Sequence, residues 1–165
     1  MQGLGRFTAF MAAACAGAAR AQGPEPGFTL VPAAERLTVG GVFADAAPAV
    51  QVAFALLLVS AVAAIVIWAV SLPKVGKGDA KGLAGALGRL RIVRSAATPL
   101  GFLAASYTLF GGFLGLANVR PAPSISVIAP GLAEAALAVM LGLLATTVAV
   151  ACERHLEARI RRAAA

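Results

Sequence analysis

The charged residues of this chain gather in short blocks and leave three long stretches that are almost entirely apolar. These stretches cover residues 46–73, 95–119 and 124–152, and Glu134 in the third is their one charge. Each exceeds the roughly 20 residues that a helix needs to cross a bilayer. The pattern therefore predicts an all-α, polytopic membrane protein with three transmembrane helices. They are placed at residues 49–72, 98–118 and 125–152.

The amino-terminal segment follows another pattern. Arg6 precedes an apolar run of residues 7–18, and small residues follow the run. Because this run has about half the length that a membrane crossing requires, residues 1–21 are predicted to be a cleaved signal peptide, with a short first transmembrane helix as the alternative. Residues 22–48 are rich in proline and glycine and are predicted to form a mostly irregular periplasmic leader with a short helix near residues 33–37.

The basic residues indicate how the spans are oriented. Residues 73–97 carry lysines and arginines with Asp79 as their only acid, and the tail, residues 153–165, is rich in arginine. Positively charged segments next to spans stay on the cytoplasmic side. We therefore expect a basic cytoplasmic loop at residues 73–97, a periplasmic connection at residues 119–124, a periplasmic amino terminus and a cytoplasmic tail.

Composition supports a membrane protein and narrows its function. The chain is 60% hydrophobic and 13% charged, with a mean hydropathy of +0.88, whereas soluble domains are about 25% charged. One histidine and two cysteines in 165 residues are a poor basis for a metal site or a separate catalytic domain, so we expect no enzyme, no metal and no cofactor. The basic residues flank apolar stretches without interleaved aromatics, which favours contact with membrane lipid and argues against nucleic acid.

A few residues near the span ends serve as landmarks. Trp68 and Pro73 are predicted to mark the exit of the first span from the bilayer, and Pro99 the first turn of the second. The tail has helical spacing and is predicted to continue the third span as a helix. His155 is expected to be an exposed residue at the membrane surface.

Small residues are arranged in a way that favours close helix packing. In a bilayer, helices approach closely where glycine and alanine leave room for their backbones. The second span contains a G-x-x-x-G pair and the third has small residues at steps of three and four, so we expect these spans to pack against each other or against another copy. Alternatively, the pattern merely reflects an alanine-rich composition. The candidate packing residues are Gly111, Gly115, Gly131, Ala135, Ala138 and Gly142.

Glu134 is the residue that bears most directly on function. Counted from the start of the third span, it lies about 14 Å along the helix, near the middle of a layer about 30 Å thick. An ionised carboxylate there is costly, and no lysine or arginine shares its depth, so it needs a hydroxyl, water or another subunit as partner. The alternative is a permanently protonated Glu134 that only joins helices. The candidate hydroxyls of a proton site are Ser106, Thr108, Thr146 and Thr147, with Ser60 also available.

Two segments resemble a known family of membrane proteins. Residues 127–135 read VIAPGLAEA and resemble the third transmembrane helix of the MotA/TolQ/ExbB proton-channel family, nearest its ExbB/TolQ branch. Residues 100–116 are similar to the second helix of that family. The resemblance covers roughly residues 47–162 and matches Glu134 to the acidic position of the third helix.

The resemblance implies a subunit of a bacterial inner-membrane complex driven by the proton motive force. Members form a homo-oligomeric ring, expected as a pentamer, around an ExbD- or TolR-like single-span partner, and drive a TonB- or TolA-like protein for outer-membrane transport or envelope maintenance. This chain departs from the family at Ala105 and Val139, where two pore-facing threonines are usual, and its cytoplasmic stretch is shorter. A non-conducting scaffold or assembly factor with the family fold is therefore the alternative.

Overall fold

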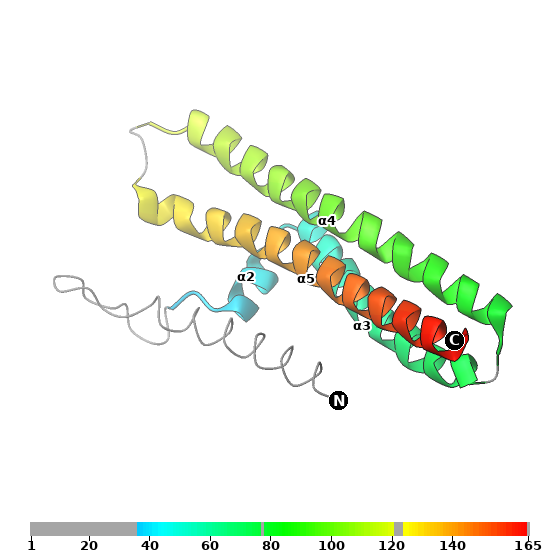
Figure 1. The fold of residues 1–165 in the computed structure, drawn as a ribbon. Coiled ribbons are helices and arrows are strands. Elements are labelled where there is room, and N and C mark those ends of the chain that lie inside the picture. Colours follow the sequence, from blue (N-terminus) through cyan, green and yellow to red (C-terminus); the bar gives the residue numbers. More distant parts are fainter. Residues whose placement is uncertain (1–35, 77, 121–123, 165) are drawn as a thin grey trace. The chain divides into compact units, whose positions relative to one another are not determined.

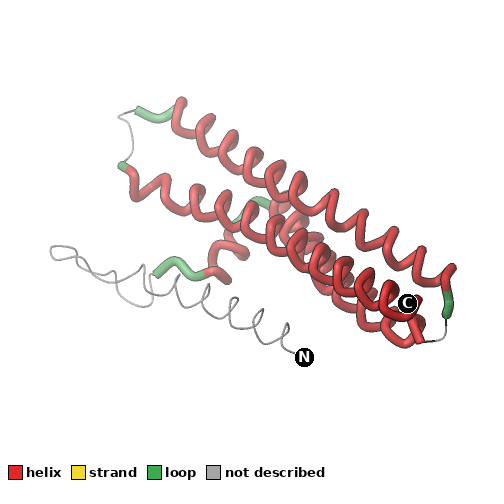
Figure 2. The backbone as a smooth tube through the Cα atoms, in the orientation of Figure 1, coloured by secondary structure: helices red, strands yellow, loops and turns green. Residues whose placement is uncertain are grey.

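The computed structural model describes residues 36–76, 78–120 and 124–164. The predicted signal peptide and the leader as far as residue 35 lie outside this part of the chain. Within the described residues, the protein forms four helices and no strand (Figures 1 and 2). Three of them are long and apolar enough to cross a membrane, which confirms an all-α protein with three candidate spans. The helices are α2 (Val39–Asp45), α3 (Pro48–Gly76), α4 (Ala80–Ala117) and α5 (Ile125–Ala164).

The three long helices pack against one another. Helices α4 and α5 run side by side, and α3 begins partway along them and follows both toward the end where the chain terminates (Figure 1). With 38 and 40 residues, α4 and α5 are each nearly 60 Å long at about 1.5 Å per residue. Because the hydrocarbon layer of a bilayer is only about 30 Å thick, both helices must extend well beyond it.

The helices continue through positions where the sequence suggests boundaries. Pro73 does not end α3, which continues to Gly76, and Pro99 lies inside α4 instead of in its first turn. A proline inside a helix removes one N–H···O bond, but the packing of α3 and α4 on either side of each proline keeps the helix continuous. Most of the basic segment, from residue 80 onward, is therefore the first half of α4.

A tight turn reverses the chain between α3 and α4. Gly78 has a φ of 68°, in the left-handed region that favours glycine. Asp79 is the N-cap of α4, and its Oδ1 accepts a hydrogen bond from the backbone N–H of Gly82 at 3.0 Å. This turn lets Leu83 and Leu90 of α4 join a buried cluster with Leu156 of α5.

The short helix of the leader lies later than the sequence predicts. Leu37 and Thr38 are not helical, and residues 33–35 lie outside the described part. The Oγ1 of Thr38 accepts a hydrogen bond from the backbone N–H of Gly41 at 3.0 Å, which is the arrangement of an N-cap. Thr38 thus starts α2, whose Val42 is buried in a cluster with the first turns of α3 and with alanines of α4 and α5.

Helices α4 and α5 come closest where two glycines face each other. A Cβ atom on Gly101 would lie 2.7 Å from the carbonyl oxygen of Ala138, and one on Gly142 would lie 2.8 Å from that of Ala97. Neither position has room for a side chain, so the backbones touch directly, as small residues permit in membrane helices. Ala138 and Gly142 of the candidate packing set lie in this contact, and Ala135 is buried beside it.

The remaining candidate packing glycines lie away from this contact. A Cβ atom on Gly111, Gly115 or Gly131 would meet nothing within 4 Å. All three instead line an open groove of about 300 Å³ between the end of α4 and the start of α5. Within the described part of this chain, the G-x-x-x-G pair therefore does not join two helices.

Candidate functional site

Glu134 lies in the third turn of α5, where α4 supplies its polar neighbour. The hydroxyl of Thr108 donates a hydrogen bond to Glu134 Oε1 at 3.1 Å and lies 3.2 Å from the carbonyl oxygen of Ala104. A threonine hydroxyl has one proton but can also accept hydrogen bonds. It can therefore donate a hydrogen bond to an ionised Glu134, or accept one from a neutral Glu134 while donating to the carbonyl oxygen of Ala104.

The carboxyl group of Glu134 is partly exposed and opens onto a cavity. This cavity has a volume of about 430 Å³, and Thr108 and Glu134 supply polar atoms to its wall. Two adjacent glycines of α4, Gly111 and Gly112, leave bare backbone on the same wall, and a Cβ atom at either would meet nothing within 4 Å. The site therefore has room beside it for water or for a side chain from another molecule.

Glu134 also lies level with the beginning of α3. Ala47, which directly precedes α3, lines the same cavity as Glu134, and Phe54 packs in one cluster with Ala104 and Ala138. At the opposite end of the apolar stretch of α3, Trp68 forms a hydrogen bond with His155 of α5. Measured against α3, Glu134 therefore lies at one end of the three-helix region, whereas counting from the start of α5 places it in the middle of a span.

The other candidate hydroxyls do not approach Glu134. Thr146 Oγ1 lies 2.7 Å from Thr98 Oγ1, about 18 Å along α5 from Glu134 at about 1.5 Å per residue. Thr147 is exposed and donates to the carbonyl oxygen of Leu143, and Ser60 donates to that of Leu57. Ser106 is exposed. The structure therefore brings Thr108, alone among the candidate hydroxyls, to Glu134.

Two further positions near the site are apolar. Ala105 is buried in the core cluster between the helices, and Val139 is partly buried against that cluster. Neither offers a hydrogen-bonding side chain. In the described part of the chain, Thr108 is thus the side chain hydrogen-bonded to Glu134, and Tyr107 also lines the cavity beside it.

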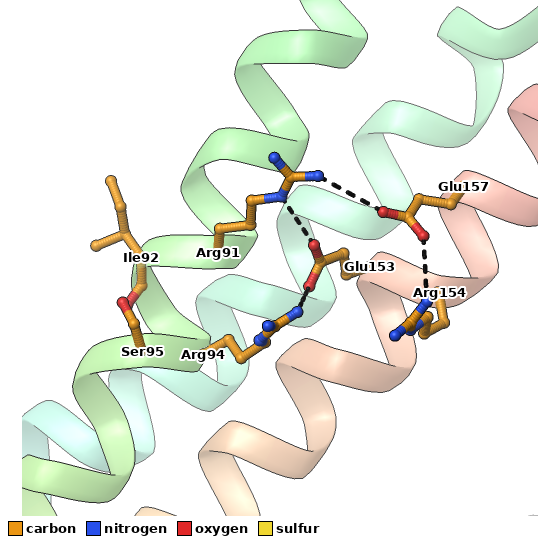
Figure 3. Close-up of polar contacts among 7 residues, drawn as sticks. All are labelled: Arg91, Ile92, Arg94, Ser95, Glu153, Arg154 and Glu157. Atoms are coloured by element: carbon orange, nitrogen blue, oxygen red, sulfur yellow. Dashed lines mark hydrogen bonds and ion pairs between the residues drawn. The ribbon is translucent and has the colours of Figure 1, made fainter.

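A second polar cluster lies at the opposite end of the long helices (Figure 3). Both oxygens of Glu153 are paired: Arg91 Nε is 3.0 Å from Oε1, and Arg94 Nη1 is 3.0 Å from Oε2. Glu157 extends the cluster, at 3.7 Å from Arg91 and 3.8 Å from Arg154. The Glu153 side chain is only 3% exposed, so these arginines compensate a buried charge that joins α4 to α5.

The arginines also determine how Glu153 titrates. Burial by itself would raise the pKa of this carboxyl, but the hydrogen bonds from Arg91 and Arg94 and their positive charges outweigh burial and hold the pKa below its ordinary value. In the sequence, these arginines indicate only the orientation of the spans. Their spacing on each helix was visible, but the pairing depends on how α4 lies against α5, which the glycine contact fixes.

His155 is held in a specific contact and is not a free surface residue. The indole N–H of Trp68 donates a hydrogen bond to His155 Nδ1 at 2.8 Å, and the imidazole is partly buried. An indole can only donate, so it requires an acceptor nitrogen that carries no proton. The expectation that His155 is exposed is therefore wrong: its side chain is partly buried against Trp68. The hydrogen bond between them joins α3 to α5.

The described part of the chain contains no cluster of side chains that could bind a metal ion. No three His, Cys, Asp or Glu side chains gather there in a way that could hold a metal ion. The arrangement places a hydrogen-bonded carboxyl beside a cavity at Glu134 and joins helices α4 and α5 at Glu153. Comparison of the sequence with known protein families and with curated proteins finds no match in either.

Proposed function

We propose that this chain is an ExbB/TolQ-like subunit of an inner-membrane complex that uses the proton motive force to power TonB- or TolA-dependent outer-membrane transport or envelope maintenance. The observation that carries the proposal is the hydrogen bond from Thr108 to Glu134 beside an open cavity, in a chain with three candidate spans. The resemblance of residues 127–135 to the third helix of this family supports the same function.

The Thr108 hydroxyl gives Glu134 a partner in both of its protonation states. An ionised carboxylate accepts a hydrogen bond from this hydroxyl, and a neutral carboxyl donates one to the hydroxyl oxygen while the hydroxyl donates to the carbonyl oxygen of Ala104. Because an unpaired polar group in a membrane is costly, a partner in both states lowers the cost of changing between them. The pair is therefore suited to load and release a proton.

The position of α3 suggests how deep the proton site lies. The apolar stretch of α3, residues 50–70, has about the length of a hydrocarbon layer. If it fills the bilayer with the basic segments on the cytoplasmic side, Glu134 lies near the periplasmic surface and Glu153 near the cytoplasmic surface. A proton on Glu134 then still has most of the membrane potential ahead of it, worth about 3–4 kcal/mol at roughly 150 mV.

The cavity next to Glu134 favours a partner helix from another protein. Gly111 and Gly112 would let such a helix approach the backbone of α4 closely. In the proposed complex, copies of this chain form a pentameric ring, and the ExbD- or TolR-like helix faces Glu134 from inside it. Proton exchange at Glu134 would then alter its contact with that helix and move the TonB- or TolA-like protein.

The experiment replaces Glu134 in the complete complex and measures proton flux into liposomes and energised uptake in cells. Glu134→Gln is expected to abolish both at normal expression, whereas Glu134→Asp keeps a titrating carboxyl and should retain part of the activity. Thr108→Ser keeps the hydroxyl and serves as the matched control for Thr108→Val, which removes it. Full activity of Glu134→Gln would exclude a titrating role for this residue.

A non-conducting scaffold is the second candidate, and one specific observation favours it. Among the described residues, no side-chain hydroxyl other than that of Thr108 is hydrogen-bonded to Glu134, and Ala105 and Val139 add none. A scaffold would depend on helix contacts such as Gly101–Gly142. In that case Glu134→Gln would be harmless, and Gly142→Leu would abolish recovery of the complex.

A further inference from the structure

A second cavity lies at the end of α5, far from Glu134. It has a volume of about 430 Å³ and lies between the last turns of α3 and the last turns of α5. Leu72, Val75 and Gly76 form its wall on α3, and Arg159, Arg162 and Ala163 form its wall on α5. The cavity therefore combines an apolar surface with two guanidinium groups.

The two arginines have no carboxylate to compensate them in the described part of the chain. They lie three residues apart and so share one face of α5. The carboxylates nearby are engaged elsewhere, since Glu153 and Glu157 pair with Arg91, Arg94 and Arg154, and Asp79 caps α4. Two like charges lining one cavity repel each other, so the site favours an anion.

The position of the cavity matches the headgroup layer of a membrane. Its α3 residues follow directly after the apolar stretch that ends at Val70, and Gly76 lies about 9 Å beyond Val70 along the helix. The headgroup layer on each side of a bilayer is about 5–8 Å thick. Long arginine side chains can reach back toward this layer from further out.

We propose that this cavity binds an anionic phospholipid, with the headgroup phosphate held by Arg159 and Arg162. A guanidinium offers paired N–H donors that fit phosphate oxygens. Leu72, Val75 and Ala163 provide an apolar surface for the glycerol and the first methylenes of the lipid chains, which a free phosphate would leave unused. The inference is independent of the proposed proton site, because it involves neither Glu134 nor Thr108.

The first experiment compares two double variants with equal net charge. The full-length chain is purified in a neutral detergent and titrated with phosphatidylglycerol or phosphatidylcholine, and bound lipid is counted by native mass spectrometry. Arg159→Gln with Arg162→Gln should weaken phosphatidylglycerol binding roughly tenfold or more. Arg89→Gln with Arg161→Gln is the control, because both are exposed and neither lines the cavity; it should bind like the wild type.

A second pair of variants tests the cavity without removing an arginine. A side chain at Gly76 would meet nothing within 4 Å, and Gly76 lines the cavity. A side chain at Gly88 would also meet nothing within 4 Å, but Gly88 lies on α4 and does not line the cavity. Gly76→Glu places a carboxylate beside the two arginines and should displace the lipid, whereas Gly88→Glu adds the same charge and should not.

Three results would overturn the proposal. Equal binding of phosphatidylglycerol and phosphatidylcholine by the wild type would show that the site does not select an anion. Equal losses in the two double variants would show that only the total charge matters. Equal occupation of the site by soluble glycerol phosphate would show that the lipid chains contribute nothing.

Discussion

The two ends of the α4–α5 pair are built in different ways. We call residues 107–117 with 127–134 the Glu134 end, and residues 80–94 with 149–163 the Glu153 end. At the Glu153 end, a buried carboxylate, two arginines and the Trp68–His155 bond tie the three helices together. At the Glu134 end, glycines face open space and a single hydroxyl meets the carboxyl.

The two carboxyl groups therefore differ in how firmly their surroundings hold them. A charge held at both oxygens by arginines is compensated, so the pKa of Glu153 is lowered and the carboxyl stays ionised to a lower pH than usual. The carboxyl of Glu134 has one hydroxyl partner and opens onto a cavity, so it can exchange that partner for water at low cost. The Glu153 end therefore holds the helices in register, whereas the Glu134 end leaves its carboxyl accessible.

The largest expected effect concerns the glycine contact between the two ends. In Gly142→Ala, the new Cβ would lie 2.8 Å from the carbonyl oxygen of Ala97, so the backbones must separate. We expect the free energy of unfolding in detergent to fall by about 2–3 kcal/mol. Gly112→Ala is the control, since its Cβ has open space, and its change should stay within about 0.5 kcal/mol. Equal effects would show that the helices are not fixed at this contact.

The next prediction removes the charge at the Glu153 end. Glu153→Gln keeps the size of the side chain but loses both charged hydrogen bonds, so stability should fall by about 1–2 kcal/mol. The loss is limited because the partners Arg91 and Arg94 are 64% and 48% exposed and remain hydrated. Glu157→Gln, whose ion pairs are longer and more exposed, is the control and should change stability less. A larger loss from Glu157→Gln would reverse the roles assigned to the two carboxylates.

The same residue predicts how stability depends on pH. Because the pKa of Glu153 is lower in the folded protein than its ordinary value of about 4.5, its contribution is complete above that value. It is lost as the pH falls through the lowered pKa of the folded state. Thermal unfolding followed from pH 7 to pH 3 should show a steeper decrease for the wild type than for Glu153→Gln. Parallel curves would contradict this linkage.

A smaller effect is expected at the bond between Trp68 and His155. Trp68→Phe, His155→Phe and the double variant form a cycle that isolates the interaction of the two side chains. The hydrogen bond should contribute a coupling energy of about 1 kcal/mol. A coupling near zero would mean that α3 is attached to α5 by apolar packing alone. The Glu153 end would then owe its rigidity to the ion pairs between α4 and α5.

The sequence predicts the long helices well but not the contacts between them. Three apolar stretches with Glu134 as their one charge suffice to identify three candidate spans, because length and apolarity are local properties. Which glycine touches which carbonyl is not local: Gly111 and Gly115 have the familiar spacing, yet Gly101 and Gly142 make the contact. Helix ends are also misjudged at Pro73 and Pro99, where tertiary packing outweighs the loss of one hydrogen bond.

At the candidate site, too, the sequence identifies individual residues but not the contacts between helices. Glu134 stands out in the sequence because it is one acid in a long apolar stretch. Thr108 is one of several hydroxyls that the sequence offers as partners, and nothing in the sequence distinguishes it. Selecting Thr108 requires the register of α4 on α5, and the level of Glu134 requires the start of α3. The paired arginines at Glu153 were visible as charges, but their partner depends on the same register.

The smallest expected effect on stability lies at the Glu134 end. Thr108→Val replaces the hydroxyl by a methyl group of similar size and removes the hydrogen bond to Glu134. Because that carboxyl opens onto a cavity, water can replace the lost partner, and the free energy of unfolding should change by no more than about 1 kcal/mol. Thr108→Ser is the control and should resemble the wild type. If Thr108→Val destabilised the protein as strongly as Glu153→Gln, the Glu134 end would itself be a structural joint, and its openness would not indicate a site for exchange.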